Sequence, residues 1–367
     1  MGAKRAILLC FAMALLLWWA PCQAHASELE GIYEKSGAGE LYGALDQETQ
    51  DLLDQAGVEE GVWEGQTGEN LLKLISQLLR ERLTAPLKGL ASLLGIVILC
   101  RLAGNFEEGG SASVLAGTLA CAGVLTAPLL ELIRSAEQVI ENACVFLGAS
   151  VPVYSALLLA SGGTVVGSSY SFLTLAAGNL ISLLSQGVLM PLLHIFLTLA
   201  LATSLCGGRF DGLLKSLYAL AKWLLVLAVT VFSGILSVQT VLNSQVDAAT
   251  GKAAKFIASS AIPIVGSAFG DAVSAIQNSV RVVKSGVGAF GILAALCIFG
   301  PLMVQTALWT GVCLLGQVAA DLFETPKLGS LFGACVSVTK LILAVLISVC
   351  LVSVVCAALV VFAKGAL

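Results

Sequence analysis

The sequence predicts an all-α, polytopic transmembrane protein, and three observations support this. Hydrophobic residues make up 58% of the chain and charged residues only 11%, whereas soluble domains carry about 25% charged residues. Apolar runs of near membrane-spanning length recur along the chain. The charges that remain gather in short stretches between these runs. A soluble domain must keep a polar surface toward water, so this composition favours a bilayer as the solvent.

The first 26 residues have the three parts of a cleavable signal peptide. Lys4 and Arg5 form a basic start, Ala6–Ala20 form an apolar run, and Ala24-His25-Ala26 is a cleavage site of the A-x-A type. The alternative is an uncleaved first transmembrane helix. Cleavage places the mature N-terminus on the extracytoplasmic side of the membrane.

Residues 27–86 form an acidic segment, with 13 acidic against 4 basic residues. Leucines at helical spacing predict one helix over Glu40–Ala56 and a second that begins at Thr67, a residue suited to cap it. We interpret this part as an extracytoplasmic helical segment. It either lies on the membrane or a partner, or is a solvated lead-in.

Residues 87–367 form the predicted multi-spanning membrane domain. Its apolar runs are Leu87–Ala103, Ser113–Leu130, Ala143–Ala160, Tyr170–Met190, Leu192–Cys206, Leu217–Val238, Gly286–Gly300, Leu302–Ala320 and Leu341–Phe362. Two pairs of runs are separated only by a proline, Pro191 or Pro301. Each pair is too long for one crossing, which predicts a helical hairpin near the proline.

An internal duplication of about 111 residues is predicted from the order of shared landmarks. Gly123-Val124-Leu125 aligns with Gly234-Ile235-Leu236, Pro152 with Pro263, and Pro191 with Pro301. Repeat A covers about residues 113–222, repeat B about 224–340, and a final span follows over 341–362. Chance similarity of two apolar sequences is the alternative.

The number of crossings stays open between seven and ten, because the segments around Pro152 and Pro263 either cross or re-enter. If both cross, the loops 207–222, 272–285 and 322–340 all lie inside. Those loops carry most of the basic residues, in agreement with the positive-inside rule.

Residues for enzymatic or metal chemistry are scarce. His194 is the single histidine after signal cleavage, and no Cys-x-x-Cys pair occurs. The cysteines resemble small hydrophobic residues in apolar runs. No basic stripe indicates nucleic-acid binding. We therefore expect no enzyme activity, no cofactor and no metal site.

The stretch Ser244–Gly291 combines six charged residues with many Gly, Ala and Ser residues. Small residues permit close approach in membranes, and charges beside apolar spans mark functional sites. The alternative is an interfacial helix whose lysines reach the headgroups. The candidate pore-lining or partner-docking residues are Asp247, Gly251, Lys252, Lys255, Pro263, Gly266 and Asp271.

Three parts of this stretch resemble the signature of the stage III sporulation protein AE family. They are Ser244-Gln245-Val246-Asp247, Gly251–Phe256 and Ile262–Gly266, and the resemblance extends over essentially the whole chain. It implies a multi-pass protein of the mother-cell membrane around the forespore. It also implies a channel-like complex with the other membrane proteins of its sporulation operon and a forespore membrane partner.

The sequence is compatible with two functions. The first is a membrane component of a multiprotein channel or secretion-like complex, needed during endospore formation. The second is a self-sufficient permease-like transporter of an ion or small solute. Duplicated halves are compatible with both.

The signal-peptide interpretation gives the first testable prediction. N-terminal sequencing of the mature membrane protein should begin at Ser27, because the small residues Ala24 and Ala26 suit the peptidase. Recovery of intact Met1 in the membrane fraction would contradict cleavage and add a transmembrane segment.

Overall fold

The computed structural model describes residues 38–59, 62–63, 67–104, 111–160, 175–176, 178–181, 183–205, 210, 212–232, 234 and 266–362. The predicted signal peptide lies outside these residues.

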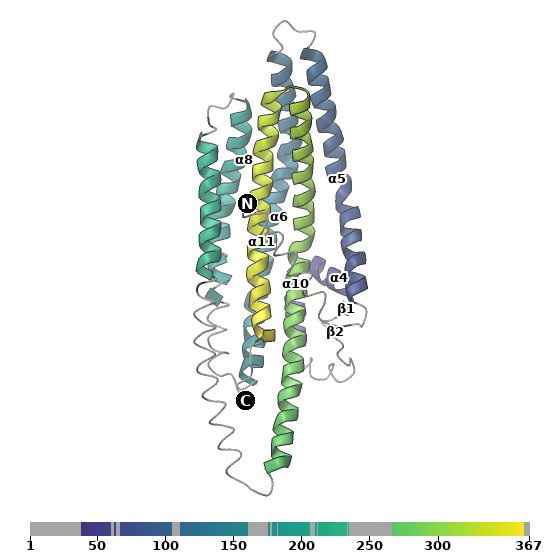
Figure 1. Ribbon diagram of the computed structural model, residues 1–367, viewed down its shortest axis with the longest axis vertical. Coiled ribbons are helices and arrows are strands. Elements are labelled where there is room, and N and C mark those ends of the chain that lie inside the picture. The colour runs from purple at the N-terminus through teal and green to yellow at the C-terminus, as the bar shows by residue number, and fades with distance from the viewer. Residues whose placement is uncertain are drawn as a thin grey trace.

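The described residues form a bundle of long helices that run alternately up and down (Figure 1). Six of them are long and apolar enough to cross a membrane, which confirms the all-α polytopic class. They are α5 (Thr67–Gly104), α6 (Ser111–Ala160), Gly178–Ser204, Gly212–Phe232, α10 (Gly266–Leu322) and α11 (Pro326–Phe362). The third of these contains the π-helix η1 (Ser185–Leu189) and most of α8 (Met190–Leu205).

The acidic N-terminal segment contributes short elements beside this bundle. They are α3 (Ala38–Gly43), α4 (Gln47–Gln55), β1 (Val58–Glu59) and β2 (Val62–Trp63). The two strands pair antiparallel, with Val58 opposite Trp63. The predicted helix over 40–56 is thus two helices, and the predicted start at Thr67 is the first residue of α5.

The expected hairpin at Pro301 does not form. Helix α10 continues through Pro301. The expected hairpin at Pro191 does not form either, because Pro191 lies inside the helical span Gly178–Ser204, directly after η1. A proline removes one backbone hydrogen bond without forbidding helix. Phe299 and Leu302 are both buried beside Pro301, so packing keeps this part of α10 helical.

The continuous α10 changes the expected topology. Residues 272–285 and the segment after Leu322 now lie at opposite ends of one helix, so the three basic loops cannot all share one side. Most of each predicted loop is helical instead: 212–222 begins the helix Gly212–Phe232, 272–285 lies within α10, and 326–340 begins α11. The described starts of the first and the third lie on the same side, as predicted. In Figure 1 the helix from Gly212 and α11 both begin at the end where α10 finishes.

The turn between α10 and α11 closes in a Schellman arrangement. Glu324 has a left-handed backbone (φ 54°). The Thr325 N–H donates to the Ala320 carbonyl at 2.9 Å, and the Glu324 N–H donates to that of Asp321 at 3.2 Å. At this end Arg101 of α5 lies 3.6 Å from the Glu324 carboxylate.

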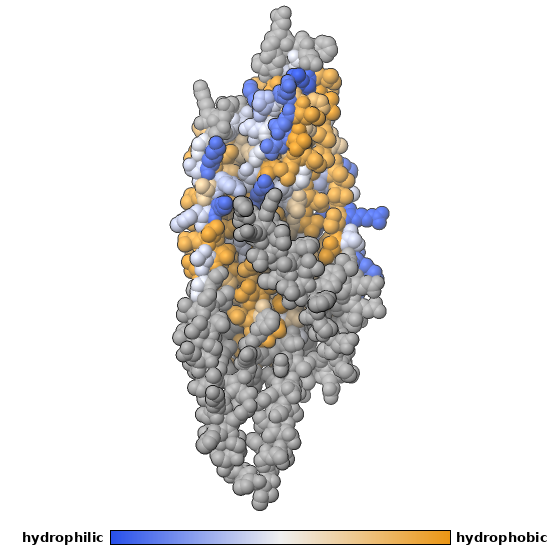
Figure 2. Space-filling view, viewed as in Figure 1, coloured by the Kyte–Doolittle hydropathy of each residue, from blue (hydrophilic) through white to orange (hydrophobic). Residues whose placement is uncertain are grey.

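Helix α11 lies at the centre of the bundle and packs most extensively against α10. Helices α6 and α8 also cover it. Close approach occurs at glycines: a Cβ on Gly316 of α10 would lie 2.8 Å from the Phe332 ring of α11. On the outside, Figure 2 shows apolar side chains along the upper part of α5, where Ile98, Leu99 and Leu102 are exposed.

Packing between α5 and α10 gives the second prediction. A Cβ on Gly89 would lie 2.8 Å from the Trp309 ring, whereas one on Gly95 meets nothing within 4 Å. Gly89→Val should lower the free energy of unfolding in detergent by roughly 1–3 kcal/mol through overpacking, measured as a lower melting temperature. The control Gly95→Val lies on the same helix, and equal effects of the two changes would contradict this packing.

Candidate functional site

The N-terminal elements α3 and α4 fold onto the bundle through a small apolar face. Leu41, Leu52, Leu53, Ala56 and Val58 are buried. Helix α4 contacts α10 and α5, and α3 contacts α6. The thin leucine stripe of the acidic segment therefore serves as a docking face toward the chain's own membrane helices.

Hydrogen bonds within this segment fix the orientation of α4. The Tyr42 hydroxyl donates to the Asp54 carboxylate at 2.7 Å. The Gln50 amide donates to the carbonyls of Tyr42 and Leu45, each at 3.0 Å. The Thr49 hydroxyl donates to Asp46 at 2.7 Å in the first turn of α4.

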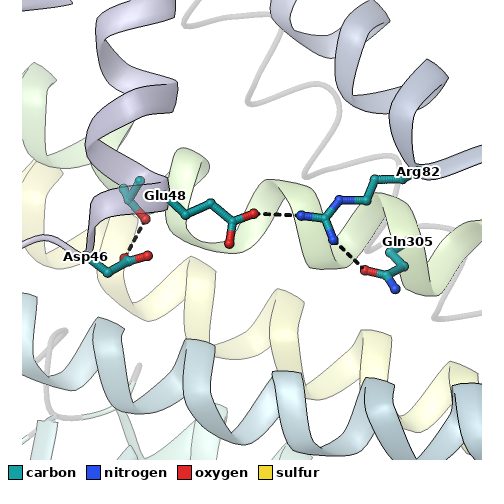
Figure 3. Close-up of polar contacts among 5 residues, drawn as sticks. Asp46, Glu48, Arg82 and Gln305 are labelled. Atoms are coloured by element: carbon teal, nitrogen blue, oxygen red, sulfur yellow. Dashed lines mark hydrogen bonds and ion pairs between the residues drawn. The ribbon is translucent and has the colours of Figure 1, made fainter.

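A polar tie then joins α4, α5 and α10 through one arginine (Figure 3). Arg82 of α5 donates to the Glu48 carboxylate of α4 at 2.6 Å. Its other terminal nitrogen donates to the side-chain oxygen of Gln305 in α10 at 3.2 Å. A guanidinium presents several donors in a fixed plane, so Arg82 can bond both partners at once.

The ion pair of Arg82 with Glu48 contributes little to the stability of the fold. The side chains of Arg82 and Glu48 are 36% and 63% exposed, and exposed ion pairs contribute at most about 1 kcal/mol. Its importance is geometric, because it fixes where the acidic segment meets the end of the apolar part of α5.

The structure describes only two of the seven candidate pore-lining or partner-docking residues. Asp247, Gly251, Lys252, Lys255 and Pro263 lie outside the described residues. Gly266 is the first residue of α10 and Asp271 lies in its second turn. The described structure therefore brings none of these candidate side chains together, and their role stays a prediction.

The first part of α10 extends beyond its helical neighbour. Gly288 lies beside Val361, and α11 ends at Phe362. The helix from Gly266 to about residue 287 therefore has no α11 alongside, and Figure 1 shows it projecting past the end of α11.

His194 has a local role in the structure. Its Nδ1 lies 3.0 Å from the Met190 carbonyl, one turn back in α8, as expected of a satisfied histidine in an apolar run. Among the residues described, no group of three His, Cys, Asp or Glu side chains could hold a metal ion.

An apolar pocket of about 40 Å³ lies between η1, the helix Gly212–Phe232 and α11. Leu184, Leu225 and Val349 are among its lining residues, with Ser185 and Ser348 also at its wall. A cavity of this size and lining can accept a methyl group or two and offers few ligands to an ion.

Sequence reasoning missed the contact between Arg82 and Gln305. They are 223 positions apart, and no local pattern links them. The available signal was weak: Gln305 is a polar residue inside an apolar run, which predicts a polar partner somewhere in the bundle.

Comparison with known proteins gives a consistent result over most of the chain. The family model described as stage III sporulation protein AE matches residues 48–365. The stage III sporulation protein AE of Bacillus subtilis (strain 168) is 30% identical over 167 residues, 45% of this chain and 42% of that relative. The match therefore spans less than half of the relative's length. No solved structure matches the chain.

The polar tie gives the third prediction. Arg82→Ala removes the bonds to Glu48 and Gln305, so α4 should detach more often. Limited proteolysis of the N-terminal segment should accelerate by up to about fivefold, which corresponds to about 1 kcal/mol.

Arg80→Ala is the matched control, because Arg80 is exposed on the same helix and makes no ion pair among the described residues. Glu48→Ala should add little to Arg82→Ala, since both remove one interaction. Additive acceleration by the two changes would show that the pair does not hold α4.

Proposed function

The chain belongs to the stage III sporulation protein AE family, and from that premise we propose that it is a membrane component of a multiprotein channel or secretion-like complex. It takes part in sporulation, and six apolar helices make it a multi-pass membrane protein. In the proposed function it lies in the mother-cell membrane around the forespore, with its mature N-terminus extracytoplasmic. Its partners are the other membrane proteins of its operon and a forespore membrane protein.

One structural observation carries the preference for a complex component over a self-sufficient transporter. Transporters gather polar and charged groups around a site near mid-membrane. Among the described residues, the core between α6, α8, α10 and α11 buries mainly apolar side chains, with some Thr and Ser and no charged residue, and the pocket at α11 is small and apolar. The described bundle thus has the character of a scaffold.

The segment Ser244–Gly291 is the proposed docking or lining surface. Its described part begins α10 and projects past the end of α11. A helix without its neighbour is available to a partner chain. Three charged residues, Asp271, Arg281 and Lys284, lie along this projecting stretch, and Asp247, Lys252 and Lys255 precede it.

The fourth prediction tests this function in sporulating cells. Lys252→Ala, Lys255→Ala and Asp247→Ala should leave the protein at its normal level in the membrane while blocking spore formation after engulfment. Charges beside apolar segments are retained for contacts with water, headgroups or partners. Purification in mild detergent should recover the operon partners with the parent chain and lose them with the variants.

Lys340→Ala, at an exposed position of α11, is the control for loss of a lysine. Reduced protein level in the variants would instead indicate a folding role. Normal sporulation in all three would refute the proposed surface. Solute transport by the purified chain alone in liposomes would favour the permease.

A further inference from the structure

The projecting start of α10 carries an apolar stripe in its sequence. Apolar residues recur there at alternating spacings of four and three residues, at Phe269, Val273, Ile276, Val280 and Val283. In a helix this alternation places the residues on one face. The charged residues of the same stretch, Asp271, Arg281 and Lys284, fall outside this register.

The same register is buried where it continues into the bundle. Val287, Phe290, Ala294 and Cys297 prolong the alternation of four and three, and all four side chains are buried. Helices α6 and α11 both contact α10. The stripe is therefore one continuous apolar face, of which the bundle covers the second part.

Both neighbours of α10 end near the level of Val287. Gly288 lies beside Val361, and α11 ends one residue later at Phe362. Gly291 lies beside Tyr154, and α6 ends six residues later at Ala160. Below that level the stripe runs on for about five helical turns without α6 or α11 beside it (Figure 1). An apolar face of that length indicates a further packing partner.

The residues that lead into α10 are the nearest candidates for that partner. Pro263 favours an end to any helix before it, because proline lacks an N–H and disfavours helical backbone in the preceding residue. Helix α10 begins three residues later, at Gly266. Connections of about 2–5 residues typically join two antiparallel helices that pack side by side.

The sequence before Pro263 carries a matching register. Leu242, Val246, Ala249, Ala253 and Phe256 show the same alternation of four and three residues. Around a turn at 262–265, the two registers fall opposite one another throughout. Leu242 then faces Val283 at one end, and Phe256 faces Phe269 at the other.

The length of the chain before α10 also fits a helix alongside it. The preceding helix ends at Phe232, which lines one pocket with Val352 of α11. From the level of Val352 down to Val361, and from Gly288 down to Gly266, the helices descend by 31 residues, or about 47 Å. The 33 residues from 233 to 265 span about 50 Å as a helix.

We propose that residues 242–256 pack antiparallel against the stripe of α10 from Phe269 to Val283, so that the two form a helical hairpin projecting past the ends of α6 and α11. The stripe is thus covered by the chain itself. The charged residues of both arms lie outside the paired registers, which leaves them on the outer surface of the hairpin. A partner in the proposed complex meets that polar surface, but the packing within the chain does not depend on the proposed function.

Disulfide trapping in the full-length chain tests the register. In native membranes treated with copper phenanthroline as oxidant, Val246→Cys with Val280→Cys should form an intramolecular disulfide, because the two positions face one another. Lys252 and Lys255 separate them, so trypsin leaves the cysteines on two peptides that the disulfide joins, as mass spectrometry detects. Val246→Cys with Val282→Cys is the matched control. Val282 lies on the same helix outside the register, so about tenfold less linked peptide is expected.

A packing variant gives a second readout without new cysteines. Ile276→Ala removes most of one side chain from the paired registers, so the hairpin should open more often and trypsin should cleave at Lys255 about tenfold faster. Ala249→Ile fills the same layer from the opposite arm and should restore most of the parent rate. Val282→Ala should leave the rate unchanged. An Ile276→Ala chain cleaved at the parent rate would contradict the packing, also where the cysteine variants do not accumulate.

Four results of disulfide trapping would overturn the proposal. Equal linking by Val280→Cys and Val282→Cys would show that no register is fixed, and no linking at the parent protein level would show that the arms do not meet. A disulfide between two differently tagged chains, one with Val246→Cys and one with Val280→Cys, would mean that a second copy covers the stripe. A link that is lost when the operon partners are produced would mean that another protein covers it.

Discussion

The close packing of α10 against α11 is the contact on which the other helices depend. In lipid, apolar side chains gain little by leaving one apolar surrounding for another, so helices associate through fit. Gly316 lets the Phe332 ring lie on the α10 backbone, and Gly288 admits Val361 near the other end of α11. With this pair in place, α5 and α6 cover α10, and α6 and α8 cover α11. The apolar spans of α10 and α11 are also the two most buried of the six.

The need to satisfy backbone hydrogen bonds in lipid explains both what the sequence could predict and where it failed. Composition and apolar runs were enough for an all-α polytopic fold, and Thr67 marked the start of α5. The lengths of the helices were not predictable in the same way. Pro301 suggested a turn, but a proline costs one hydrogen bond and the packing of its buried neighbours offsets that loss. The predicted duplication was not needed to explain any described contact, and it stays a prediction.

The candidate site, too, could be predicted from the sequence only in part. A resemblance in Ser244–Gly266 marked a family, and the family match over residues 48–365 supports it. The tie from Arg82 to Glu48 and Gln305 could not be found from sequence, because its three residues come from distant segments whose register is set by helix packing. The apolar face of α4 was visible as leucines at helical spacing. Its target, the chain's own α10, was not, because nothing in a leucine stripe distinguishes a bilayer from a neighbouring helix.

The two ion pairs among the described residues join segments that lie far apart in the sequence. Arg101 of α5 meets Glu324 in the turn before α11, and Arg82 of α5 meets Glu48 of α4. Both pairs are partly exposed, and exposed ion pairs contribute little to stability. They therefore help to select which segments meet, whereas the fit of apolar side chains against glycines holds the described helices together.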